Sequence, residues 1–203
     1  MDTSAILALF DEQMRRKAAP DCLFVGNGWS GVLWRPDDYD DVQPLVARLR
    51  ERLLAAGLEP DDEETVVVAE AASIPPPPDD VELRLVTDEF VDLAGDVFGA
   101  RFDLPEKAVA VVAVVDGKAV SGGRVDLEEG VEFAGLFGGV TLPEYRGRGL
   151  YRATVAKRAE LARERGYRWL YSDALPTSRP ILERLGFVAI TTTTPFVIPA
   201  STD

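Results

Sequence analysis

The sequence contains no histidine and only one cysteine, Cys22. The absence of histidine excludes a Ser-His-Asp triad, a Cys-His pair and any histidine-ligated metal site. A single cysteine cannot form an intrachain disulfide, which suits a reducing compartment, and no histidine is available to activate it as a nucleophile. A proton acceptor in any catalytic site is therefore a carboxylate, a tyrosine, a backbone group or water, and we expect no metal.

Long apolar runs and an excess of cations are also missing. No run approaches the roughly 18 apolar residues of a membrane-spanning helix, and the first residues, Met1-Asp-Thr-Ser, lack the basic region of a signal peptide. We therefore expect a cytoplasmic protein without a membrane partner. The formal net charge is −13, from 22 Lys and Arg against 35 Asp and Glu. Such an acidic chain opposes non-specific nucleic-acid binding and favours a cationic substrate such as an amine.

Four consecutive prolines interrupt the chain at residues 75–78. They cannot join a helix or a central strand, so they predict a stiff, extended linker. We place the main boundary there, with an N-terminal α/β extension over residues 1–75, the linker over residues 76–80 and the main domain over residues 81–203. In the extension, apolar spacing predicts helices over residues 1–17 and 41–56 and strands over residues 22–25, 31–34 and 65–69.

The main domain alternates strand and helix patterns in the order β-α-β-β-β-α-β-α-β. Strands are predicted over residues 81–85, 108–115, 120–126, 131–140, 169–172 and 187–198, and helices from residue 87 and over residues 149–165 and 177–185. Asp116-Gly117 is a signal for a tight hairpin between two of the strands. This order predicts a mixed α/β sheet with helices on both faces.

The turn before the second of these helices carries two glycines and three arginines, in Val140-Thr-Leu-Pro-Glu-Tyr-Arg-Gly-Arg-Gly-Leu-Tyr-Arg-Ala153. A helix N-terminus has unpaired N–H groups and a partial positive charge. Glycines let a ligand approach the backbone closely, and arginines add charge-assisted donors. Together they predict an anion site that suits a pyrophosphate. The turn lacks the third glycine of a dinucleotide fingerprint and the Gly-Lys-Ser/Thr of a P-loop.

The region Val81–Ile198 resembles the GCN5-related N-acetyltransferase (GNAT) superfamily. Arg146-Gly-Arg-Gly149 is similar to the start of that family's pyrophosphate loop, Arg/Gln-x-x-Gly-x-Gly/Ala. Ile181-Leu-Glu-Arg-Leu-Gly-Phe187 is similar to its closing Leu-Tyr-Glu-Lys-Leu-Gly-Phe. The helix at Phe10–Arg16 and the threonine run at Thr191–Pro195 resemble a bacterial subgroup whose substrate the resemblance does not name.

The resemblance implies a GNAT-like acyl-CoA transferase fold with a mostly antiparallel sheet, in which the N-terminal extension covers the acceptor side. It implies an N-acetyltransferase that moves an acetyl group from acetyl-CoA, its co-substrate, to a primary amine of a small molecule or peptide, by direct attack on the thioester. A non-catalytic acyl-CoA-binding or regulatory module is the alternative, and transfer to a hydroxyl or of a longer acyl group stays open. The expected partner is the amine acceptor, and the protein is a monomer or a homodimer.

The resemblance also places coenzyme A along the strand that ends at Val140 and the loop behind it. The expected cofactor-binding residues are Phe137, Gly138, Gly139, Val140, Arg146, Gly147, Arg148, Gly149, Leu150, Tyr151, Thr177, Ser178 and Arg179. Gly138-Gly139 allows a bulge and a close approach, although a packing bulge without a ligand explains it too. A backbone N–H near Val140 would polarise the thioester carbonyl.

The catalytic candidates are Glu132, Asp173 and Tyr151. The two carboxylates stand at strand ends and would serve as the base if burial raised their pKa values, and solvated strand ends are the alternative. Tyr151 replaces the family's Gly or Ala, and Leu182 replaces a Tyr that often protonates the leaving thiolate. Tyr151, Tyr171 or water is left for that role. The aromatic candidates for the acceptor pocket are Phe10, Trp29 and Trp34.

Overall fold

The computed structural model describes residues 1–16, 50–86, 95, 97–98, 104 and 106–199. The strands predicted over residues 22–25 and 31–34, together with Trp29 and Trp34, lie outside these residues. So do most of the helix predicted over residues 41–56, of which residues 50–55 are described and helical, and the start of the helix predicted from residue 87. Within the described ranges, no helix has both the length and the apolar character needed to cross a bilayer.

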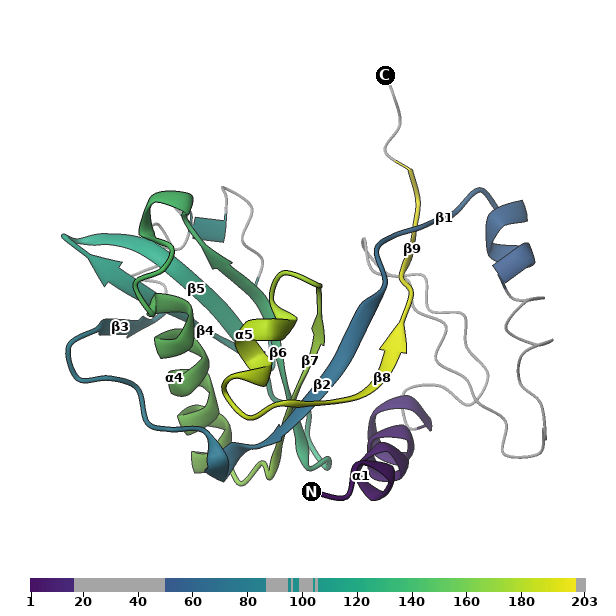
Figure 1. The fold of residues 1–203 in the computed structure, drawn as a ribbon, viewed down its shortest axis with the longest axis horizontal. Coiled ribbons are helices and arrows are strands. Elements are labelled where there is room, and N and C mark those ends of the chain that lie inside the picture. The colour runs from purple at the N-terminus through teal and green to yellow at the C-terminus, as the bar shows by residue number, and fades with distance from the viewer. Residues whose placement is uncertain (17–49, 87–94, 96, 99–103, 105, 200–203) are drawn as a thin grey trace.

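Seven strands form one sheet in the order β3-β4-β5-β6-β7-β2-β8 (Figure 1). Their bounds are β2 Glu64–Glu70, β3 Glu82–Leu85, β4 Ala108–Val115, β5 Lys118–Asp126, β6 Phe133–Thr141, β7 Trp169–Ala174 and β8 Val188–Thr193. Every neighbouring pair is antiparallel except β6 and β7, which run parallel. The prediction of a mixed, mostly antiparallel sheet is confirmed. Two short strands, β1 (Glu59–Pro60) and β9 (Phe196–Val197), pair separately.

Local sequence explains why the central hairpin forms. The residues of β4 are alanine and valine throughout and are mostly buried, as a strand covered on both faces requires. Asp116 and Gly117 have φ values of 51° and 79°. Two consecutive positive φ angles are what a two-residue hairpin turn needs, so the predicted connection between β4 and β5 is confirmed.

Helices cover both faces of the sheet, as predicted. The long helix α4 (Leu150–Glu164) lies along one face over β4 and β5 (Figure 1) and buries an alanine- and valine-rich stripe together with the short helix α5 (Arg179–Glu183). Helix α1 (Thr3–Phe10) packs on the other face beside β8 and buries Ile6 and Phe10. The helix predicted over residues 1–17 is confirmed from Thr3 to Arg16, with the difference that Asp11–Arg16 continue it as a π-helix.

Strand β2 precedes the proline linker in the sequence but lies inside the main sheet. It pairs with β7 on one side and β8 on the other, both antiparallel. Its residues Thr65–Ala69 are buried. The sheet therefore does not follow the division predicted at residues 76–80, since it takes one of its interior strands from residues 1–75.

Candidate functional site

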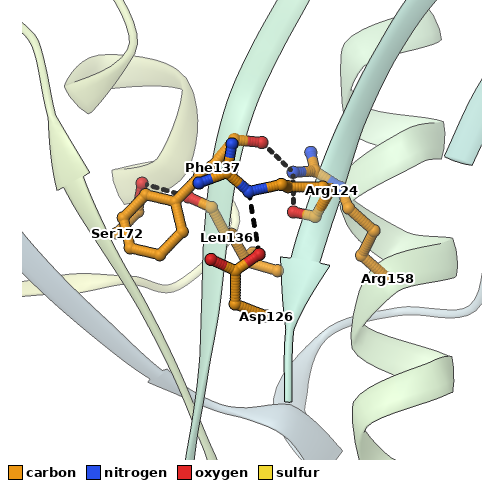
Figure 2. A network of polar contacts seen from close by, with 6 residues as sticks. All are labelled: Arg124, Asp126, Leu136, Phe137, Arg158 and Ser172. Atoms are coloured by element: carbon orange, nitrogen blue, oxygen red, sulfur yellow. Dashed lines mark hydrogen bonds and ion pairs between the residues drawn. The ribbon is translucent and has the colours of Figure 1, made fainter. Parts of the chain in front are cut away.

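Strands β6 and β7 separate part-way along their length. Their parallel pairing joins Phe133–Gly135 to Trp169–Tyr171, and the Ser172 hydroxyl then donates a 2.8 Å hydrogen bond to the Leu136 carbonyl (Figure 2). Beyond this point β6 continues to Thr141 and β7 to Ala174 without further pairing between them. We call the region between Phe137–Thr141 and Asp173–Ala174 the fork.

A β-bulge lies in the β6 arm of the fork. Val140 faces Gly122 and Phe137 faces Arg124, so three steps along β6 match two along β5. The extra residue falls at Gly138-Gly139, where Gly138 has a φ of +62°. A Cβ atom on Gly139 would stand 2.6 Å from the Tyr151 ring, which therefore packs directly on this glycine's backbone. The predicted bulge is confirmed, and it turns one β6 residue out of the ladder.

The contact between Gly139 and Tyr151 makes a prediction about stability. Gly139→Ala should lower the free energy of unfolding by about 1–3 kcal/mol, because the added methyl group overlaps the ring and forces it to move. Adding Tyr151→Ala should recover part of that loss, whereas adding Tyr151→Phe should not. Denaturant unfolding of the three variants measures this coupling. Strictly additive losses would show that the ring and the glycine are independent.

The other part of the candidate site is the N-terminus of α4. Gly149 caps the helix in the left-handed conformation, with a φ of +78°, and its carbonyl accepts from the Ala153 N–H at 3.0 Å. The N–H groups of the first helical turn have no partner within the helix and carry its partial positive charge. A Cβ on Gly147 or Gly149 would meet nothing within 4 Å, so the turn is uncrowded at both glycines.

The two arginines of this loop are exposed and held by the loop itself. Arg146 Nε donates to the Thr141 carbonyl at 3.2 Å. The Arg148 guanidinium donates to the Glu144 carbonyl at 3.3 Å and lies 5.0 Å from the centre of the Tyr145 ring. Both cations therefore stand beside the open helix end, and the site can bind a dianion such as a pyrophosphate.

The bulged strand, the glycine turn and the helix N-terminus are features that the sequence predicted, and they lie next to the fork between β6 and β7. The family model described as the acetyltransferase (GNAT) family matches residues 82–187, more than half of the chain. The chain belongs to the acetyltransferase (GNAT) family. The matched region runs from β3 to the residue before β8.

Solved structures show the same fold at low identity. A GCN5-related N-acetyltransferase from Kribbella flavida has a TM-score of 0.58 at 20% identity, covering 75% of this chain and 64% of that chain. An N-acetyltransferase-like protein from Streptococcus suis has a TM-score of 0.55 at 18% identity, covering 74% and 66%. A functionally unknown conserved protein from Staphylococcus epidermidis has a TM-score of 0.58 at 17% identity, covering 80% and 69%. This chain thus spans less than two thirds of the Kribbella protein. None of the curated proteins matches the sequence.

The residues of α5 that the GNAT resemblance assigned to the cofactor make local contacts. Thr177 is exposed, and the Ser178 hydroxyl donates to the Leu175 carbonyl at 3.2 Å. Arg179 Nε donates to Glu183 at 2.7 Å, and its guanidinium reaches Thr65 of β2 at 3.3 Å. Arg179 therefore links α5 to β2 by a hydrogen bond. Leu182, where the family often has Tyr, is 1% exposed and belongs to the core.

The two candidate carboxylates lie at opposite ends of the strands. The Glu132 side chain accepts from Gln13 at 3.3 Å, and its carbonyl accepts from the Trp169 N–H, at the end where β6 and β7 are still paired. That is roughly 25 Å from Val140 at the usual rise of a strand. Asp173 lies in the β7 arm of the fork and is half-buried. The structure brings Asp173, and not Glu132, to the fork.

A carboxyl group that the sequence did not single out lies near Asp173. Glu64 of β2 shares the sheet face of Asp173, whose register partner is Val66. Burial raises the pKa of Glu64, and the Asp173 and Asp61 carboxylates raise it further. Burial also raises the pKa of Tyr171, with Asp173 and Asp126 adding to the effect. This face of the fork therefore carries negative potential. Glu64 was missed because it precedes the linker, far from Asp173 in the sequence.

The raised pKa of Glu64 predicts a pH-dependent stability. Between its ordinary value of 4.5 and its raised folded value, the folded state binds more protons than the unfolded state, so stability falls as pH rises through that window. Glu64→Gln should therefore raise the melting temperature at pH 7–8, with the gain shrinking as pH falls towards 4.5. Thermal melts across this range test it, with the exposed Glu164→Gln as the control. A gain independent of pH would contradict the assignment.

Proposed function

We propose that this protein is an acetyl-CoA-dependent N-acetyltransferase that acetylates a primary amine. The observation that carries the proposal is one continuous segment, Phe137–Arg152, which supplies a bulged strand beside a fork and then an open helix N-terminus. The first feature suits the acyl end of acetyl-CoA and the second its pyrophosphate. Membership of the GNAT family supports this pairing.

The residues present fit coenzyme A. The N–H groups of Leu150, Tyr151 and Arg152 would hold the pyrophosphate, with Arg146 and Arg148 beside them. Neither glycine of the turn would crowd the ligand, because the space where a Cβ would stand is empty. Bound acetyl-CoA supplies an activated acyl group on a thioester. The exposed backbone of Gly138 and Gly139 would lie along its pantetheine arm.

Each step of the proposed acyl transfer can be assigned to a backbone group or a side chain in or beside the fork. A backbone N–H near Val140 would donate to the thioester oxygen and stabilise the charge that develops there. The amine attacks as the neutral base, after releasing one proton to water. Its nitrogen forms the new bond to the acyl carbon, the carbon–sulfur bond breaks, and Asp173 takes the second proton that the nitrogen loses. Tyr151, whose ring lies on Gly139, would return a proton to the sulfur directly or through water.

The electrostatics of the fork favour a cationic acceptor. Burial raises the pKa values of Glu64 and Tyr171. The Asp173 carboxylate raises both further, and Asp126 adds to the effect on Tyr171, which reflects negative potential on this face. The rings of Phe10, Phe137 and Tyr171 pack edge to face and give the same face an aromatic wall. An amine arriving as a cation is attracted by the carboxylates and by the ring faces.

Calorimetry and a thiol-release assay test the proposal. Acetyl-CoA should bind saturably to the purified full chain, and free coenzyme A should appear only when an amine is added. Binding without turnover on a broad panel of small and peptide amines would instead favour a non-catalytic acyl-CoA-binding module, which Leu182 in place of Tyr supports. Absence of acetyl-CoA binding would overturn both functions.

A further inference from the structure

A buried arginine with no carboxylate partner lies beneath the bulge. Arg158 of α4 is 1% exposed. Burial lowers the pKa of its guanidinium, and the nearby Tyr151 side chain opposes that shift. Among the residues that the structure describes, the salt bridges involve other cations. Burying a charge without a counter-charge is costly, and an apolar side chain would fill the same space at lower cost.

The guanidinium joins three elements through neutral oxygens. One terminal nitrogen donates to the Arg124 carbonyl of β5 at 3.1 Å and to the Phe137 carbonyl of β6 at 3.5 Å. These two residues are register partners and flank the bulge on one side. Nε donates to the Thr154 carbonyl of α4 at 3.0 Å. Figure 2 shows the guanidinium reaching from the helix to both strands.

The absence of a side chain at Gly123 makes room for the Arg158 guanidinium. A Cβ on Gly123 of β5 would stand 2.5 Å from the Arg158 guanidinium nitrogen, so the cation lies directly on the backbone of that strand. Arg158, Thr154 and Tyr151 share one face of α4 at helical spacing. The same rigid helix thus carries the anion-binding end, the ring on Gly139 and the link to the bulge.

We propose that Arg158 is a positioning residue for acyl transfer: it fixes the bulge at Gly138-Gly139, and with it the backbone N–H groups near Val140, at a set distance from the pyrophosphate-binding end of α4. The inference rests on the proposed function, in which one of those N–H groups meets the thioester oxygen. Because the carrier is held at its phosphates and reacts at its far end, a shift between these two points misplaces the carbonyl. A misplacement of about 1 Å can lower a rate by about 100-fold.

Steady-state kinetics of Arg158→Lys and Arg158→Met test the inference. A lysine cannot reach two carbonyls with the same geometry, so both variants should lose about 100-fold in kcat while the KM for acetyl-CoA stays within about threefold. Arg165→Met, an exposed arginine on the same helix that bonds only to the Leu161 carbonyl in the described structure, is the matched control and should keep full activity. An unchanged kcat, or a loss confined to KM, would overturn the inference.

A second variant moves the guanidinium without removing it. Gly123→Ala places a methyl group against Arg158 and should lower kcat in the same way, whereas Gly95→Ala, which meets nothing within 4 Å, should not. Wild-type kcat in Gly123→Ala would count against the inference, and circular dichroism of each variant separates a kinetic loss from a loss of folded protein.

Hydrogen–deuterium exchange of residues 137–141 gives a readout that needs no turnover. Exchange there should be faster than wild type in Arg158→Lys, Arg158→Met and Gly123→Ala, with the rest of the sheet unchanged, and equal exchange would overturn the link to the bulge. A wild-type protein that turns over no amine would overturn the proposed function instead. The exchange data would then decide by themselves whether Arg158 holds the bulge.

Discussion

Gly149→Glu should abolish acetyl-CoA binding, with an affinity loss of more than about 100-fold. The glycine caps α4 and faces the open space in front of the helix's unpaired N–H groups. A glutamate there would put a negative charge and a bulky side chain where the pyrophosphate is proposed to bind, and the charge would also interact with the helix end in place of the ligand. Isothermal titration of acetyl-CoA into wild type and variant measures the change.

The matched control separates charge from backbone strain. At a φ of +78° any residue with a Cβ is strained, by roughly 1–2 kcal/mol. Gly149→Ala carries that strain without the charge, so it should lower the melting temperature about as much as Gly149→Glu does while binding acetyl-CoA far better. Affinity equal to wild type in Gly149→Glu would remove the basis for placing the cofactor here.

Asp173→Asn should lower kcat by about 100- to 10,000-fold if the carboxylate accepts the amine proton, the range typical for loss of a general base. The asparagine keeps the size of the side chain and its place in the β7 arm of the fork, and it removes only the basicity. The KM for acetyl-CoA should change little, because the proposed pyrophosphate site is at the N-terminus of α4 and not in β7. Thiol release at saturating amine measures the effect.

Glu132→Gln is the control that the sequence itself offers, since both carboxylates were candidates. Its side chain bonds Gln13 at the paired end of β6 and β7, so its kcat should stay within about twofold of wild type. A large loss in Glu132→Gln with none in Asp173→Asn would reverse the assignment.

Local signals in the sequence were sufficient for the elements that make up the cofactor side. The hairpin at Asp116-Gly117, the bulge at Gly138-Gly139 and the helix start at Gly149 each depend on backbone angles that glycine or aspartate adopts most readily. Such preferences act over a few residues. For this reason the predicted strands around them agree closely with β4, β5 and β6.

Strand pairings and side-chain contacts between residues distant in the sequence could not be predicted from such local preferences. Nothing local to Glu64–Glu70 indicates that this strand lies between β7 and β8, because the pairing joins segments about a hundred residues apart. The closeness of Glu64 to Asp173 follows from that pairing and was missed with it. Likewise, the sequence of α4 contains several charged residues, and Arg158 did not stand out among them. Its helical spacing could have indicated that it is buried, since residue 158 lies four positions after Thr154 and four before Ala162 on the buried stripe.

The place of β2 in the sheet limits how the protein can be cut. The region matched by the family model covers residues 82–187, so a fragment trimmed to it would lack both β2 and β8. Strand β7 would then become the edge of the sheet and present an unpaired row of amide and carbonyl groups, which invites pairing between copies. Expression of residues 82–187 alone should therefore yield aggregates, and the shortest version that folds has to start ahead of Glu64.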